Sequence, residues 1–577
     1  MGSSDGTHYQ APEGTYKCVD WANPILNRSA AQHGSAGSAF STPRGPALNE
    51  APRMSAVSFR ALNAPQPMSG GLDLCLTAQG LDANPREYCS AGEAFTQRSY
   101  AGIYKGCGSL SPRPTRPKTG VKSNNPLIVR VNIHKDLQKI LSQRTEDVTV
   151  TFVSASKTLL WYINIGQGIQ EPVGRVTFSQ TPVCHDVNQF TCLQDRLDVL
   201  VGFAKGDMIW MDPIAMKYTR LNKDGTMLSA ALRQIRWVPQ SENLFLSAHA
   251  DGSIMVLDRD RDDSLGMDQI PMQQSHWDSR ATMLVSQDAP SKLGGGTLMS
   301  RQKETPRERL NPVSYWRVST KAITDIAFSP DHVRVAVTSE DGLWRLIDAD
   351  AQILLHSFAS YFGGFTCVCW SPDGRLALTG GQDDLLTLWL PNEGYILARA
   401  QGHNSFVTGI TFDPWYARHS EDLYRFVSVG EDRNLCFWDF SISNLSHPRL
   451  HGRSWSHSSH RRSIGSFRPM NPDVYVPAST RAQVSMLQSM MCAKVPGGML
   501  SALRISPNML LLLHCDGQLD LIARPTSPRY VQLDGEVDLG RTENNLKGPP
   551  KHLSHAFALS IPGMRKGTSN NLAYTVV

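Results

Sequence analysis

Short apolar runs alternate with turn-forming residues along most of the chain after about residue 127, and no long amphipathic helix interrupts them. Short strands at regular spacing, separated by turns, are typical of an all-β domain. Residues 1 to about 125 differ: they are rich in Gly, Ser, Ala, Pro and Asn and keep neither the period of a strand nor that of a helix. We therefore expect this N-terminal region to be largely disordered and dispensable for folding.

The strand-rich part contains a repeated unit. Each clear copy has an apolar strand, a Ser-Pro-Asp type of turn and then a second turn marked by aspartate, as at Asp341, Asp383 and Asp432. Asp341 and Asp383 are 42 residues apart, and Asp383 and Asp432 are 49 apart. A period of ~40–45 residues with four strands per unit is the blade of a WD-repeat β-propeller.

Looser copies of the unit lie on both sides of the three clear ones, at residues 148–162, 197–212, 235–258 and 503–522. With them the count becomes seven. The sequence thus predicts an all-β, seven-bladed WD-repeat propeller, in which the first and last blades match the repeat least well.

The domain limits follow from the same pattern. We expect a disordered, low-complexity region at residues 1–125, the propeller at 126–525 and an irregular C-terminal tail at 526–577. Two polar segments, at about residues 259–312 and 441–480, interrupt the repeats and are predicted to be long solvated loops.

Several residues of the repeat have predicted structural roles. Asp383 and Asp432 mark the tight turns of the fifth and sixth units, and Trp389 and Trp438 occupy the large apolar position that fills the gap between blades. His403 opens the sixth unit, 29 residues before Asp432. In WD repeats a histidine at this place bonds the turn aspartate of its own blade. The alternative, a catalytic His403–Asp432 pair, is disfavoured because no nucleophile accompanies it.

Motifs for catalysis or metal binding are missing from the sequence. There is no Gly-x-x-x-x-Gly-Lys-Ser/Thr, no His-Glu-x-x-His and no Gly-x-Ser-x-Gly. The 11 cysteines are scattered, and Cys367 and Cys369 are more typical of core packing than of a zinc pair. We therefore predict no enzyme activity, no cofactor and no metal.

Charge and hydropathy bear on partners and location. A net charge of +5 with only 19% charged residues is too mild to indicate nucleic-acid binding, although a nucleic-acid-associated propeller remains an alternative. No stretch approaches the ~18 apolar residues of a membrane span. Without a secretory signal and with scattered thiols, a cytoplasmic and/or nuclear location is expected.

Part of the chain resembles one family more closely than WD repeats in general. The runs that carry the resemblance are 184–189, 241–245, 311–316, 360–374, 378–384 and 401–405. They are similar to the CreC family of fungal catabolite-repression proteins, which is related to the animal WD-repeat proteins of the WDR-twenty and DMWD type. The resemblance covers roughly residues 120–440. Residues 12–16 also resemble the family start, whereas residues 17–118 do not, and Ile522-Ala523 stand where the family has a tryptophan.

The resemblance implies a function. CreC-like proteins are non-catalytic scaffolds that bind, activate and stabilise a ubiquitin-specific protease of the CreB type. The complex removes ubiquitin from targets in carbon catabolite repression, and further WD-repeat subunits are possible partners. A general WD-repeat scaffold of another complex is the alternative.

Three large apolar residues stand where turns are usually polar: Tyr361, Phe362 and Phe406. They precede the innermost strands of the fifth and sixth blades, so we predict that they emerge on one face of the ring and bind the partner. The alternative is that they tuck under the rim as core.

Overall fold

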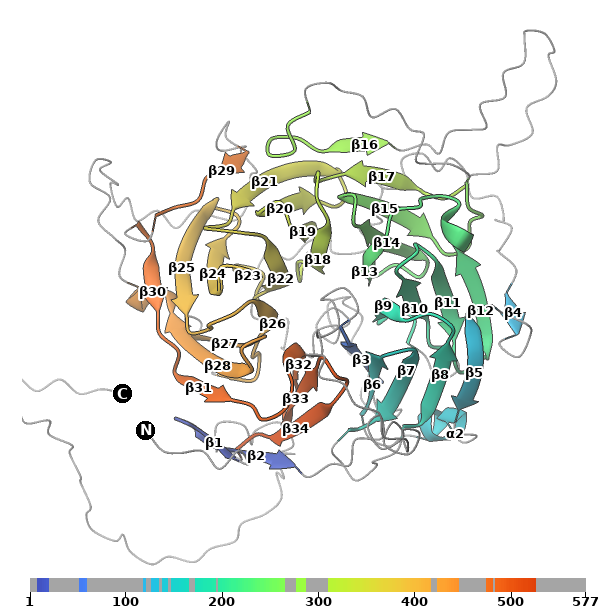
Figure 1. Ribbon diagram of the computed structural model, residues 1–577, viewed down its shortest axis with the longest axis horizontal. Helices are drawn as coiled ribbons and strands as arrows, with labels where there is room; N and C mark the ends of the chain where they lie inside the picture. Colours follow the sequence, from blue (N-terminus) through green and yellow to red (C-terminus); the bar gives the residue numbers. More distant parts are fainter. Residues whose placement is uncertain are drawn as a thin grey trace, which may run out of the picture. The chain divides into compact units, whose positions relative to one another are not determined.

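The strands form seven sheets that are arranged as blades around a central axis (Figure 1). The computed structural model describes residues 8–19, 51–59, 118–120, 126–133, 137–143, 147–165, 172–192, 196–264, 277–286, 310–416, 423–445, 474–480 and 483–525. The predicted all-β, seven-bladed architecture is confirmed. No helix in these ranges is long and apolar enough to cross a membrane.

In each blade the first four strands from the axis outward are antiparallel, and the first of them lies nearest the axis. Blade 1 contains, from the axis outward, β3 (Arg53–Phe59), β6 (Val148–Ala155), β7 (Thr158–Ile163), β8 (Gly174–Phe178) and β5 (Ile128–Ile133). Blade 2 contains β9 (Pro182–Val187), β10 (Val199–Phe203), β11 (Met208–Asp212), β12 (Lys217–Leu221) and β4 (Thr119–Gly120). Blade 3 contains β13 (Leu232–Trp237), β14 (Leu244–His249), β15 (Ser253–Asp258), β17 (Ser314–Arg317) and β16 (Leu284–Ser286).

The remaining blades follow the same plan. Blade 4 contains β18 (Ile323–Phe328), β19 (Arg334–Ser339), β20 (Leu343–Asp348), β21 (Ile353–Ala359) and β29 (Tyr475–Val476). Blade 5 contains β22 (Phe365–Trp370), β23 (Ala377–Gly381), β24 (Leu385–Leu390), β25 (Tyr395–Gln401) and β30 (Ser485–Leu487). Blade 6 contains β26 (Val407–Phe412), β27 (Leu423–Gly430), β28 (Asn434–Ser441) and β31 (Met491–Lys494). Blade 7 contains β32 (Leu500–Ile505), β33 (Met509–His514), β34 (Leu519–Ala523), β2 (Gly14–Val19) and β1 (His8–Ala11). Helical turns are α2 (Leu137–Ser142), η4 (Lys223–Gly225) and η6 (Ile442–Asn444).

The core lies between neighbouring blades. Middle strands such as β14 and β15 bury every side chain, because both faces of their sheet are covered by adjacent blades. Trp389 of blade 5 packs against Trp344 of blade 4, with ring centroids 5.6 Å apart. Trp438 of blade 6 belongs to a buried cluster with Leu386 and Leu388 of blade 5. The two tryptophans therefore fill the gaps between blades, as their place in the repeat predicts.

Three segments of the N-terminal region are strands of the propeller, which corrects the predicted domain start at residue 126. β3 is the innermost strand of blade 1 and pairs with β6 from Arg53 to Phe59. β2 pairs with β34 and closes blade 7, and the two-residue β4 lies at the outer edge of blade 2. The sequence missed them because they lie outside any repeat and pair with distant strands. The other residues of 1–125 lie outside the described residues, as does the tail at 526–577.

The two predicted loop insertions also contribute strands. From the first insertion, β16 adds an outer strand to blade 3. From the second, β29 pairs in parallel with β21 of blade 4. Just after this insertion, β30 pairs in parallel with β25 of blade 5. The chain then supplies β31 to blade 6, so this segment follows the outer edges of three successive blades (Figure 1).

Candidate functional site

Two aromatic side chains stand out on the rim where the innermost strands begin. The exposed fraction of Phe362 is 75% and that of Tyr361 is 53%. Among the described residues, Phe362 is the most exposed large apolar side chain. Both belong to the loop of residues 360–364 that connects β21 of blade 4 to β22 of blade 5. The structure therefore places these two predicted contact residues at the surface, not under the rim.

The loop that carries Phe362 is held on both sides. On the blade 4 side, Ser360 N–H donates to the Gly342 carbonyl at 2.8 Å, and the Ser360 hydroxyl donates to the Gly363 carbonyl at 2.6 Å. On the blade 5 side, Gly364 N–H donates to Gln382 Oε1 at 2.9 Å, and Gln382 N–H donates to the Gly364 carbonyl at 2.9 Å. A Cβ on Gly364 would lie only 3.0 Å from a backbone atom of blade 4. These bonds fix the loop before any partner arrives.

Arg399 and Asp383 lie behind the loop. The Arg399 guanidinium carbon is 4.9 Å from the centre of the Tyr361 ring, close enough for a cation–π contact. Burial lowers the pKa of Arg399, while the nearby Asp383 carboxylate opposes the shift. Burial raises the pKa of Asp383, against bonds from backbone groups that include Phe362. Asp383 accepts a bond from Leu385 N–H at 3.3 Å, in the turn between β23 and β24.

Phe406 occupies the corresponding loop of blade 6 but is only half-exposed. Its carbonyl accepts a bond from Glu431 N–H at 3.0 Å, and the Ser405 hydroxyl donates to Glu431 Oε2 at 3.2 Å. The next residue, Val407, is fully buried at the start of β26. Because β22 and β26 are neighbouring innermost strands that start at the same rim, Phe406 lies on the same side of the ring as Phe362.

His403 and Asp432 make the contact expected from the repeat. His403 Nδ1 lies 3.1 Å from Asp432 Oδ1, and His403 Nε2 lies 2.7 Å from the Ser428 hydroxyl. Trp438 Nε1–H donates to the same hydroxyl at 2.9 Å. Burial raises the pKa of Asp432, but the bond with His403 and the backbone N–H bonds from Asn404 and Asn434 together outweigh it, and the net shift is downward. Asn404 N–H also donates to Asp432 at 2.9 Å, so this chain of bonds braces the loop that leads to Phe406.

Sequence reasoning missed Ser428, although a signal was present. In blade 5, Trp389 Nε1–H donates to Thr379 Oγ1 at 2.8 Å, which is the same bond made by Trp438 to Ser428. A hydroxyl ten residues before the blade tryptophan is therefore common to both units. Tyr361 stands four residues before Phe365, as His403 stands four before Val407. Blade 5 thus has an outward tyrosine where blade 6 has a buried histidine.

We expect His403→Ala or Asp432→Ala to lower the free energy of unfolding by about 1–3 kcal/mol, since each leaves a buried polar partner unsatisfied. The double variant should lower the free energy of unfolding by less than the sum of the decreases in the two single variants. Urea unfolding of the four proteins measures this. Strict additivity would show that the two side chains do not stabilise the fold through each other.

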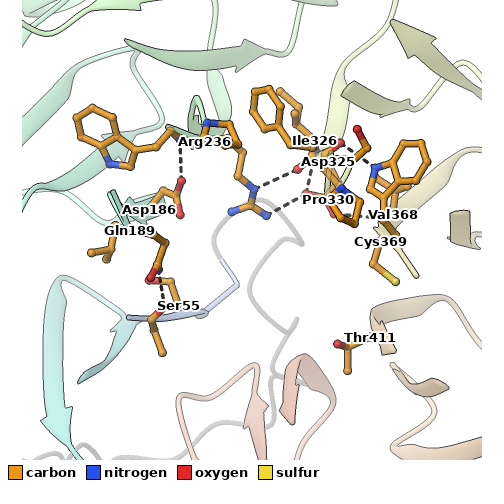
Figure 2. Close-up of a pocket in the computed structure, with 18 of the residues that line it drawn as sticks. Ser55, Asp186, Gln189, Arg236, Asp325, Ile326, Pro330, Val368, Cys369 and Thr411 are labelled. Atoms are coloured by element: carbon orange, nitrogen blue, oxygen red, sulfur yellow. Dashed lines mark hydrogen bonds and ion pairs between the residues drawn. The ribbon is translucent and has the colours of Figure 1, made fainter. Parts of the chain in front are cut away.

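At the other end of the innermost strands lies a cavity of about 360 Å³ (Figure 2). Arg236 of β13 points toward blade 4, with its Nη2 3.3 Å from Asp325 Oδ1 and its Nε–H donating to the Ile326 carbonyl at 3.1 Å. Asp186 accepts a bond from Trp237 N–H at 2.7 Å. The carboxylates are thus engaged in holding neighbouring blades together. Among the described residues no group of three or more His, Cys, Asp or Glu side chains could hold a metal ion.

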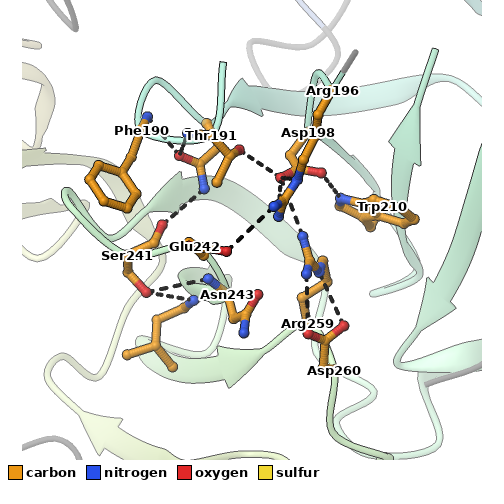
Figure 3. Close-up of polar contacts among 12 residues, drawn as sticks. Phe190, Thr191, Arg196, Asp198, Trp210, Ser241, Glu242, Asn243, Arg259 and Asp260 are labelled. Carbon is orange, nitrogen blue, oxygen red and sulfur yellow. Dashed lines mark hydrogen bonds and ion pairs between the residues drawn. The ribbon is translucent and has the colours of Figure 1, made fainter. Parts of the chain in front are cut away.

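A second polar cluster joins blades 2 and 3 (Figure 3). The Asp198 carboxylate is fully buried and accepts bonds from Thr191 at 2.6 Å, Arg196 at 2.8 Å, Arg259 at 3.2 Å and Trp210 at 2.9 Å. Thr191, Arg196 and Arg259 reach Oδ2, and Trp210 reaches Oδ1. Because Arg259 directly follows β15 of blade 3 and Asp198 directly precedes β10 of blade 2, the cluster links the two blades.

A comparison with protein-family models identifies three of the repeats. The family model described as "WD domain, G-beta repeat" matches residues 311–348, 353–389 and 394–439. The chain contains WD40 repeats. Each matched WD40 repeat begins near the outer strand of one blade (β17, β21 or β25) and ends on the third strand of the next, so every repeat joins two blades.

Similar proteins include a curated relative and a solved structure. The chain is 34% identical over 323 residues to the UBP9-binding protein bun62 of Schizosaccharomyces pombe, an alignment that covers 56% of this chain and 57% of that protein. The WD40 chain thus spans little more than half the length of this relative. A chain in a crystal structure of the mitotic checkpoint complex aligns with 72% of this chain and 97% of its own length, at 13% identity and a TM-score of 0.42. That second similarity is too weak to carry an argument.

Proposed function

We propose that this WD40 propeller is a non-catalytic subunit that binds a ubiquitin-specific protease of the CreB type and activates or stabilises it. The complex would remove ubiquitin from proteins that control carbon catabolite repression. The observation that carries the proposal is the exposed Tyr361–Phe362 pair on a loop that is already fixed in place.

The geometry of the loop suits a protein partner. Aromatic residues are enriched in protein interfaces and among the few residues that dominate binding energy. A loop fixed by hydrogen bonds in the free protein loses little conformational entropy on binding, so more of the contact energy appears as affinity. Phe406 on the same rim extends the apolar surface toward blade 6.

The class of partner is supported by the relative whose name describes it as binding UBP9. The resemblance to CreC-like proteins implies a partner of the same class. The test mixes the purified chain with a purified CreB-type ubiquitin-specific protease and follows cleavage of a fluorogenic ubiquitin substrate. We expect a stable complex on size exclusion and faster cleavage than by the protease alone, with no cleavage by the propeller alone. Absence of a complex would refute the proposal.

Replacing Phe362 by Ala is expected to weaken protease binding by about 30-fold or more, because removing a central aromatic contact typically costs ~2 kcal/mol or more. The melting temperature should not change, since the side chain is 75% exposed. Isothermal titration and thermal melting measure the two quantities.

Phe190→Ala is the matched control, because Phe190 is also exposed but follows β9 at the opposite end of the innermost strands. It should bind the protease like the unmodified protein. Phe406→Ala is expected to reduce both affinity and melting temperature, since Phe406 is half-buried. Unchanged affinity in Phe362→Ala would place the interface elsewhere.

A further inference from the structure

Two cysteines face each other across the outer edge of blade 6. Cys436 lies on β28 and Cys492 on β31, and they are directly opposite in the antiparallel register. Both are free thiols, and their sulfur atoms are 3.1 Å apart. The two residues are 56 positions apart in the chain, so only the return of β31 to blade 6 brings them together.

The strand register favours a bond between them. Val495 N–H donates to the Arg433 carbonyl, so these two opposite residues form a hydrogen-bonded pair of the ladder. The next pair, Asn434–Lys494, is therefore a non-hydrogen-bonded pair. Pairs alternate along an antiparallel ladder, so Cys436–Cys492, two positions on, is of the same type. The Cα atoms of such pairs are about 4.5 Å apart. That separation lies within the ~4.4–6.8 Å range of disulfides.

The two thiols differ in reactivity. Cys492 is exposed, whereas Cys436 is buried in the core shared with blade 5. The hydrogen bond from Cys436 lowers the pKa of Cys492, against burial and the charge of Asp432. The same hydrogen bond, together with burial, raises the pKa of Cys436. Because thiolates are the attacking species, Cys492 is suited to react first and Cys436 to follow.

We infer that Cys492 and Cys436 form a site of reversible oxidation, at which a hydroperoxide converts the facing thiols into a cross-strand disulfide. The Cys492 thiolate attacks one peroxide oxygen and becomes a sulfenic acid, and the other oxygen leaves as water after taking up a proton. The Cys436 sulfur then attacks the sulfenic sulfur and a second water leaves. Overall, two thiols and one hydrogen peroxide give one disulfide and two waters. A small-molecule thiol reverses the reaction by exchange.

The bond would secure the point at which the second insertion rejoins the ring. β31 is the outermost strand of blade 6 and holds to β28 over four residue pairs. Cys492 also lies near Gly402, with its sulfur 3.9 Å from the Gly402 carbonyl, next to the His403 loop. A disulfide closing this long loop restricts the unfolded chain, so oxidation should raise the melting temperature of the propeller by several degrees.

Other cysteines of the chain provide internal controls. Cys367 and Cys369 are two apart on β22, and burial raises the pKa of both thiols. Burial also raises the pKa of Cys515 to about 11. These thiols should stay reduced under conditions that oxidise Cys492.

The experiment treats the full-length chain with a small excess of hydrogen peroxide, blocks the remaining thiols and digests it with trypsin without reduction. Residues 434–449 and 482–494 form separate tryptic peptides that each contain one cysteine, Cys436 or Cys492. We expect these two peptides joined, with the loss of two hydrogen atoms, and separated again by dithiothreitol. The melting temperature should rise on oxidation and fall back on reduction.

The variants distinguish the possible outcomes. Cys436→Ser should accumulate the sulfenic acid of Cys492, which a dimedone probe detects, and should show no melting shift on oxidation. Cys515→Ser should behave like the unmodified chain. Overoxidation of Cys492 without pairing in the unmodified chain, or an equal melting shift in Cys436→Ser, would overturn the inference.

Discussion

A chain that begins at Lys118 is expected to lose the cooperative melting transition of the propeller, which reverses the expectation from sequence that the N-terminal region is dispensable for folding. The truncation removes β3, the innermost strand of blade 1, which pairs with β6 over seven residues. Val57 and Phe59 on β3 are almost fully buried, and burying such side chains contributes about 1.5–3 kcal/mol each. Without β3, the inner edge of β6 also loses its hydrogen-bond partners.

The same truncation removes the two outer strands of blade 7. β2 and β1 are the outer strands of that blade, and Tyr9 and Tyr16 on them are each 1% exposed. Calorimetry or circular dichroism on heating measures the transition. A chain that ends at Pro525 is the control, and we expect it to melt like the full chain, since it keeps every described strand. A Lys118 truncation that melts at the full-length temperature would show that these strands do not stabilise the ring.

Arg425→Met is expected to lower the free energy of unfolding by about 3–5 kcal/mol, the usual cost of breaking a buried ion pair from one side. The Arg425 side chain on β27 is fully buried and bonds two carboxylates, Glu13 and Asp439. Its Nε–H and Nη2–H each donate to Asp439 at 2.6 Å, and Nη2–H also donates to Glu13 Oε2 at 3.1 Å. The ring of Tyr416 lies 3.5 Å from the guanidinium carbon.

The pH dependence of this variant follows from Glu13. Burial raises the pKa of Glu13, but the hydrogen bonds and charge of Arg425 outweigh it, so the folded-state pKa is below the ordinary value of 4.5. A carboxylate with a lowered pKa stabilises the fold above its unfolded pKa, and this stability is lost as pH falls through the folded value. The unmodified protein should therefore lose stability in acid below about pH 4.5, whereas Arg425→Met should lack this contribution.

Urea unfolding at neutral and acidic pH measures both effects. Arg280→Met is the control, because Arg280 pairs with Asp278 at the surface and its loss should leave the unfolding midpoint unchanged. The double variant Arg425→Met/Glu13→Gln should lower the free energy of unfolding by less than the sum of the two single variants. Equal midpoints for Arg425→Met and the unmodified chain would contradict the role of the cluster.

Local signals in the sequence were sufficient for the repeat and much of the rim. The turn aspartates, the blade tryptophans Trp389 and Trp438 and the His403–Asp432 spacing all lie within one unit, and the structure has them in the expected arrangement. Tyr361 and Phe362 stood out for a local reason as well, because large aromatics rarely occupy turns. These features repeat at a near-constant spacing, so the sequence carries them several times over.

The sequence by itself thus determined the fold class, the blade count and the position of the aromatic rim, because strand alternation and turn chemistry act over a few residues. Only the tertiary structure decided how the ring is completed. Glu13 and Arg425 are 412 residues apart, and Cys436 meets Cys492 only after a long insertion returns to blade 6. Such pairings depend on which open strand edge is available in the folded ring, and a short segment outside the repeat carries no local signal for that choice.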